Sequence, residues 1–166
     1  KLVKETEIPS GHDPNKYIVE RIKAKSHDGR MIPISLVRLK DSKQDGNSKV
    51  LLYAYGAYKH SVDPSFSAAR FCLVDRGITF AIAHVRGGGD LGDIWHEEGK
   101  RKYKKNTFLD FIACANHLID QRYTYKGGIC FYGGSAGGLT GGALANMAPD
   151  LFFSMLLLVP FVDTMT

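Results

Sequence analysis

The chain has 166 residues, the usual length of a single domain, and 44% of them are hydrophobic, which is normal for a packed globular core. Its longest apolar run, residues 151–162, is too short to span a bilayer, so we expect no membrane partner. The formal net charge is +5, and most of the excess lies in the basic run at residues 100–105. No aromatic stacking platform or nucleic-acid-binding motif surrounds this run, so a solvated loop is favoured over a nucleic-acid-binding patch.

The first elements in the chain form a hairpin. Residues 17–24 and 31–37 alternate apolar and polar side chains, and the turn signal His27-Asp28-Gly29 lies between them. We expect an antiparallel pair after a polar lead-in at residues 1–16, and a loop at residues 40–49.

From Val50 onward, strands and helices alternate. Apolar runs predict strands at 50–55, 78–85, 128–132 and 151–159. Helical spacing or position predicts three helices between them: one from Pro64 to about Asp75, one over 108–119 after a long loop at 86–106, and one over 135–147. This order predicts an α/β fold with a mostly parallel sheet, helical crossovers and both faces covered.

The most informative motif is G-x-S-x-G at residues 133–137, directly after a predicted strand and before a predicted helix. This is the context of the nucleophile elbow of α/β-hydrolases, in which a strained turn exposes the serine hydroxyl. Ser135 is therefore the predicted nucleophile. The N–H of Ala136, at the helix N-terminus, is placed to meet a developing oxyanion. The alternative is a glycine-rich turn with an incidental serine.

A serine nucleophile needs a base, and in this fold the chain order is serine, acid, histidine. All six histidines precede Ser135. We therefore expect the triad acid and histidine to lie beyond Thr166, and residues 17–166 to be the N-terminal part of an α/β-hydrolase domain that is inactive alone. The apolar last strand would then be an unprotected edge, which predicts a possible dimer or poor solubility.

Two rival motifs are less favoured. Residues 87–92 match G-x-G-x-x-G, but a dinucleotide site requires a helix directly afterwards, so we expect a structured loop and no organic cofactor. His96-Glu97-Glu98 begins like a zinc-protease helix, but position 100 is lysine, so the ligand pair is incomplete. His84, in a predicted buried strand, is interpreted as a satisfied core histidine.

Cysteine usage predicts the compartment. Cys72, Cys114 and Cys130 lie in apolar segments at a spacing that fits no metal site. Scattered, odd-numbered cysteines are typical of a reducing compartment, and residues 1–13 show no signal peptide. We expect a cytoplasmic protein without a metal.

Tyr55, at the end of the first parallel strand, is the remaining candidate. The loop after that strand supplies the second oxyanion donor in this fold, so its hydroxyl is one interpretation and a boundary aromatic is the other.

Several stretches resemble the prolyl oligopeptidase family of serine peptidases, and most closely its oligopeptidase B branch. The similarity runs from about residue 17 to the end, at residues 53–58, 85–89, 92–100, 106–111, 133–139 and 149–152. The resemblance implies that Ser135 is the nucleophile and that the Tyr55 hydroxyl forms the oxyanion hole with the N–H of Ala136. Two details favour oligopeptidase B. Ala136 follows the serine where post-proline members usually carry asparagine, and residues 159–163 resemble the oligopeptidase B pattern.

The resemblance further implies a cytosolic endopeptidase that cuts short peptides after Arg or Lys, without metal or organic cofactor, and with a preceding β-propeller that screens the entrance. The chain would require that propeller and the C-terminal part of the hydrolase domain. The alternatives are a post-proline oligopeptidase or esterase on the same fold, or a short non-catalytic binding protein.

Overall fold

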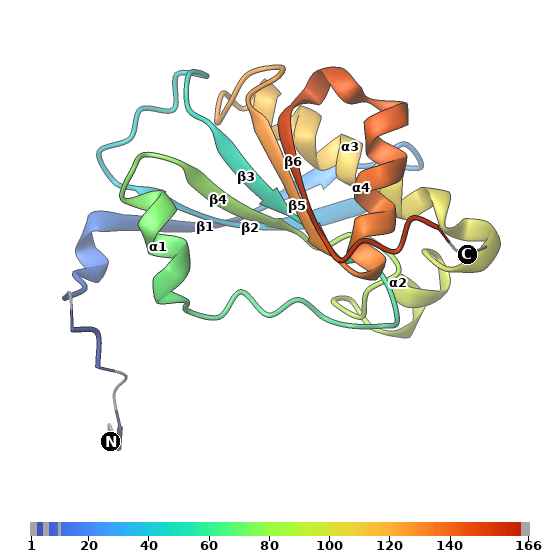
Figure 1. Ribbon diagram of the computed structural model, residues 1–166, viewed down its shortest axis with the longest axis horizontal. Helices are drawn as coiled ribbons and strands as arrows, with labels where there is room; N and C mark the ends of the chain where they lie inside the picture. The colour runs from blue at the N-terminus through green and yellow to red at the C-terminus, as the bar shows by residue number, and fades with distance from the viewer. Residues whose placement is uncertain (1–2, 5–6, 10, 164–166) are drawn as a thin grey trace.

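A mixed sheet forms the centre of the molecule (Figure 1). The computed structural model describes residues 3–4, 7–9 and 11–163, and within them the strand order is β1-β2-β4-β3-β5-β6. The predicted lead-in, residues 1–16, is therefore only partly described. The last three residues of the predicted hydrolase part, 164–166, lie outside the described residues. The strands are β1 (Tyr17–Lys25), β2 (Met31–Leu39), β3 (Val50–Tyr53), β4 (Thr79–Ala83), β5 (Ile129–Gly134) and β6 (Phe152–Leu158).

Helices cover both faces of this sheet (Figure 1). The α-helices are α1 (Ala68–Val74), α2 (Asp93–Glu97), α3 (Lys105–Asp120) and α4 (Ala136–Met147), and short 3₁₀ turns occur at Pro14–Lys16, Arg101–Tyr103 and Pro149–Leu151. Helices α3 and α4 pack on one face with the larger core cluster, and α1 packs on the other. Along β3, Leu52 belongs to the first cluster and Leu51 to the second, so the parallel strands are buried on both sides.

The predicted hairpin and parallel sheet are both confirmed. Strands β1 and β2 pair antiparallel with Lys25 opposite Met31, and β2 continues antiparallel onto β4. Strands β4, β3, β5 and β6 are parallel neighbours. Their carboxyl ends therefore meet at one edge of the sheet, where α/β folds place their functional loops.

The helix predicted from Pro64 begins later, at Ala68. The residue before it, Ser67, is extended, with φ −148° and ψ 113°. Phe66 stacks on Phe71 and lies edge-on to His12 of the lead-in. The packing of Phe66 on the nearby Phe71 and on the distant His12 accompanies the extended backbone, whereas Pro64 alone indicated that the helix would begin earlier.

The loop predicted at 86–106 is more ordered than expected, because α2 and the turn at Arg101–Tyr103 lie within it. Trp95 anchors this segment: it is buried, and its indole N–H donates to the carbonyl of His84 at 2.9 Å. The buried Trp95 thus accompanies a short helix in a stretch whose charge pattern indicated a loop.

Strand β6 forms the outer edge of the described sheet, and several of its apolar side chains are exposed. Phe153, Leu156 and Leu158 are 48%, 49% and 53% exposed. No helix among the described residues is long and apolar enough to cross a bilayer.

Candidate active site

Ser135 occupies a strained turn between β5 and α4. Its backbone has φ 53° and ψ −121°, a conformation that non-glycine residues rarely adopt. Its N–H donates to the carbonyl of Leu158 at 2.9 Å, and its carbonyl accepts from the N–H groups of Gly138 and Phe161 at 2.9 and 3.0 Å. The residue itself is exposed. The elbow geometry predicted from the motif is confirmed.

Gly137 allows α4 to approach the end of β3 closely. A Cβ atom at this position would lie 2.9 Å from the carbonyl oxygen of Ala54 and 3.4 Å from the Cα of Tyr55. Contacts of 2.9 Å to backbone are too short for a real Cβ, so only glycine fits without movement. This contact brings Tyr55 and Ser135, which are 80 positions apart in the sequence, to the same edge of the sheet.

The third predicted site residue, Ala136, is the first residue of α4. The first N–H groups of a helix have no intrahelical acceptor, and they lie at the positive end of the helix dipole. The half-buried Tyr55 ring lies edge-on to His60, with centroids 5.3 Å apart. The structure therefore brings Ser135, Ala136 and Tyr55 together, and their catalytic roles remain predictions.

No histidine among the described residues is hydrogen-bonded to Ser135. His84 is satisfied in the core, as predicted: its Nε2 lies 2.9 Å from the Ser35 hydroxyl, and its Nδ1 lies 2.7 Å from Asp90. This serine–histidine–aspartate chain is not a second elbow. Ser35 lies within β2, paired with β1 on one side and β4 on the other, so its strand N–H groups face neighbouring strands rather than a substrate.

A cavity of about 380 Å³ adjoins the elbow. Ala136, Leu139 and Phe161 line one side of it. The other sides are lined by Ala57, Tyr58, Gly87, His96, Gly99, Lys100, Arg101 and Lys104. The Lys104 ammonium donates to the carbonyl of Gly56, with a 2.5 Å separation, and burial lowers the pKa of this amine to about 8.

The role of Lys104 is not apparent from the sequence, in which residues 100–105 form one basic run that predicts a solvated loop. Arg101, Lys102 and Lys105 are indeed exposed, but Lys104 is only partly accessible. The available signal was helical phase: Lys104 lies three and seven residues before the buried Thr107 and Phe111, on the same side as the buried face of α3.

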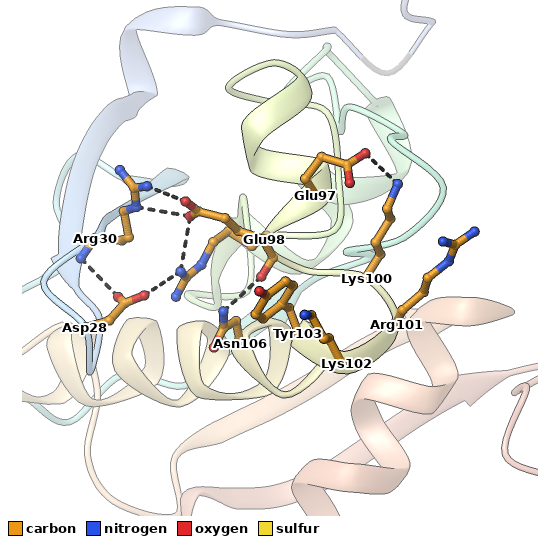
Figure 2. A pocket seen from close by; sticks show the side chains of 10 residues that line it. Asp28, Arg30, Glu97, Glu98, Lys100, Arg101, Lys102, Tyr103 and Asn106 are labelled. Carbon is orange, nitrogen blue, oxygen red and sulfur yellow. Dashed lines mark hydrogen bonds and ion pairs between the residues drawn. The ribbon is translucent and has the colours of Figure 1, made fainter.

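A larger cleft, of about 730 Å³, lies elsewhere on the same loop region (Figure 2). Its charged side chains are largely paired with each other: Arg30 bonds Glu98, and Lys100 bonds Glu97. None of Ser135, Ala136 and Tyr55 lines this cleft, whereas Ala136 lines the smaller cavity. We therefore regard it as a network that stabilises the loop and not as the reaction site.

The rival dinucleotide motif is also accounted for by packing. A short helix, α2, does begin after Gly92, but Gly87 packs its backbone against Gly56 and Gly99, where a Cβ would collide. These glycines bring the loop after β4 against the loop after β3. The contact of these two backbone segments explains why glycine stands at these positions.

The sheet order, the two helical layers and the serine elbow define an α/β-hydrolase fold. A profile of the prolyl oligopeptidase family matches residues 64–166. The chain belongs to this family of serine peptidases.

Relatives include both sequence and structural matches. The chain is 46% identical over 165 residues to dipeptidyl aminopeptidase BI of Pseudoxanthomonas mexicana and 44% identical over 159 residues to protease 2 of Moraxella lacunata, covering 99% and 96% of this chain. Oligopeptidase B of Leishmania major superposes with a TM-score of 0.93 at 46% identity over 98% of this chain. Oligopeptidase B of Trypanosoma brucei, with covalently bound antipain, superposes with a TM-score of 0.94 at 44% identity over 99% of this chain.

The chain spans 23% of the length of each of these four proteins. The similarity to oligopeptidase B expected from the sequence is thus confirmed at the level of family and fold.

Proposed function

We propose that Ser135 is the nucleophile of a serine peptidase, and that the Tyr55 hydroxyl and the Ala136 N–H form its oxyanion hole. In this mechanism the Ser135 hydroxyl attacks the scissile carbonyl, an acyl-enzyme forms as the amine leaves, and water then releases the acid. The observation that carries the proposal is the exposed Ser135 at φ 53°, at the N-terminus of α4 and beside the end of β3.

We further propose that residues 17–166 form the N-terminal part of a peptidase domain acting on short peptides. In support, the chain spans 23% of its longer peptidase relatives. A base for Ser135, a β-propeller and the remaining strands of the sheet would come from other parts of a protein of that length. A cytoplasmic location remains a proposal that rests on the three free cysteines.

Cleavage after Arg or Lys is the proposed specificity. Its support is the similarity to oligopeptidase B, at 44–46% identity, against 38% for prolyl endopeptidases. The cavity beside Ala136 does not add to this support, because cations and no carboxylates line it. The acidic groups that would read a basic side chain must therefore come from outside this cavity.

The experiment compares Ser135→Ala with Ser48→Ala, a serine in the loop before β3, in the natural full-length protein. We expect Ser135→Ala to lower kcat by about 10⁶-fold and to abolish labelling by a fluorophosphonate probe, while Ser48→Ala keeps both. Retained labelling of Ser135→Ala would show that another serine is the nucleophile.

The specificity is tested separately with peptides that differ only in Arg, Lys or Pro before the scissile bond. We expect kcat/KM to be highest for Arg and Lys. A preference for Pro would support the post-proline alternative, and no hydrolysis of any of them by a folded full-length protein would support the binding-protein alternative.

A further inference from the structure

Lys104 is a partly buried cation in an unfavourable place. It is the N-cap residue of α3, where the helix dipole is positive and disfavours an ammonium. The described residues place no carboxylate within ion-pair distance of its Nζ, although the exposed Lys59 and Lys126 and the half-buried Lys100 each have one. Desolvation without a counter-ion costs free energy, so a specific interaction must hold the amine there.

Two contacts hold the amine: its Nζ lies 5.9 Å from the centroid of the Phe108 ring, and it hydrogen-bonds Gly56, the residue that follows Tyr55. The Lys104 Nζ donates to the Gly56 carbonyl oxygen at 2.5 Å. Gly56 has φ +66°, and a Cβ atom there would lie 2.5 Å from the Thr107 methyl and 2.8 Å from a Val85 methyl. The turn after β3 is therefore pressed against the first turn of α3, and Lys104 is the side-chain donor to its carbonyl.

The same lysine also borders the reaction site. Lys104 and Ala136 line the same cavity. Tyr55 packs against Gly137, which is the residue after Ala136. The Gly56 peptide is thus held between Lys104 on one side and the Tyr55 residue on the other. A rotation of this peptide would move Tyr55 relative to the elbow.

We propose that Lys104 is a positioning residue, which fixes the Gly56 carbonyl and thereby holds the Tyr55 hydroxyl in the oxyanion hole. The proposal rests on the proposed roles of Ser135 and Tyr55. Without the ammonium, the partly buried carbonyl would lose its donor and turn toward the water of the cavity. Displacement of a catalytic group by about 1 Å costs up to about 10²-fold in rate.

The test is a double-mutant cycle in the full-length enzyme. We expect Lys104→Met, which keeps the apolar stem, to lower kcat by about 10- to 100-fold with little change in KM, because the oxyanion hole acts mainly in the transition state. Lys104→Arg, which keeps the charge and donors, should recover most of kcat. The matched control is Lys105→Met, the adjacent exposed lysine, and it should retain wild-type kcat.

The cycle with Tyr55→Phe separates positioning from a structural effect. In the Tyr55→Phe background we expect Lys104→Met to cost less than about 3-fold, because the hydroxyl that Lys104 positions is already absent. Lys104→Gln replaces Lys104→Met in the cycle if the methionine variant does not fold.

Two results would overturn the positioning role: wild-type kcat in Lys104→Met, or the same fold-loss in both backgrounds. The proposed function fails by a different result, namely full activity of Ser135→Ala or Tyr55→Phe. The two failures are therefore distinguishable.

Discussion

Arg86 and Asp110 form a buried, doubly hydrogen-bonded ion pair that joins the end of β4 to α3. The Nε of Arg86 donates to one carboxylate oxygen at 2.8 Å, and an Nη donates to the other at 2.7 Å. The two residues are 1% and 0% exposed. Asp28 in the hairpin turn bonds the other Nη of Arg86, and Ser26 bonds Asp110, so the pair also ties the hairpin to the hydrolase sheet.

We predict that Asp110→Asn destabilises the full-length protein by about 3–5 kcal/mol, because it leaves a buried guanidinium without its full counter-charge. Denaturant unfolding measures this change. The matched control is Asp150→Asn, which breaks an exposed pair with Lys126 and should cost about 0–1 kcal/mol. If the two substitutions lowered the free energy of unfolding equally, the buried pair would contribute no more to stability than the exposed one.

Tyr55→Phe removes one proposed oxyanion donor and leaves the ring. We expect kcat to fall by about 10²–10³-fold, with KM nearly unchanged. Steady-state kinetics on a short peptide measures both constants. Tyr53→Phe, two residues earlier on β3, is the control and should retain activity. A Tyr55→Phe enzyme with normal kcat would remove Tyr55 from the site.

Gly137→Ala tests the close approach of α4 and β3. The added methyl group would meet the Ala54 carbonyl at 2.9 Å, so the helix must move away from Tyr55. We expect kcat to fall by about 10²-fold, since the two halves of the oxyanion hole separate. Ala145→Ser, on the exposed side of the same helix, should leave kcat unchanged; a comparable loss there would mean that α4 tolerates no change at all.

The pKa of Lys104 predicts a pH-dependent stability difference. Burial lowers this pKa from 10.5 to about 8, so between these values the unfolded chain binds a proton that the folded chain lacks. Stability contributed through Lys104 therefore rises as pH increases from about 8 to 10.5. Relative to Lys104→Met, the wild-type protein should gain free energy of unfolding across that window, as urea titrations at several pH values would record. If the difference in free energy of unfolding between the wild type and Lys104→Met stayed constant across this pH range, the lowered pKa of Lys104 would be contradicted.

The sequence predicted those elements for which local pattern and tertiary packing agree. The apolar runs at β3, β4, β5 and β6 and the G-x-S-x-G motif located the sheet and the elbow, because a buried parallel strand and a strained serine turn each require a short, specific residue pattern. The predicted helix at 64–75 and the loop at 86–106 were less accurate. There, Phe66 contacts His12 of the lead-in and the indole of Trp95 bonds the His84 carbonyl, and the local sequence pattern records neither contact.

Sequence by itself determined the fold class, the family and the identity of Ser135, Ala136 and Tyr55 as candidates, since motifs and resemblance are properties of neighbouring residues. Only the tertiary structure placed Tyr55 against the elbow through Gly137, and only it distinguished Lys104 from the exposed lysines around it. The physical reason is that burial and hydrogen-bond partners depend on segments far apart in the chain. One lysine in a basic run becomes desolvated when α3 packs against the turn after β3, and no local pattern of charge records that contact.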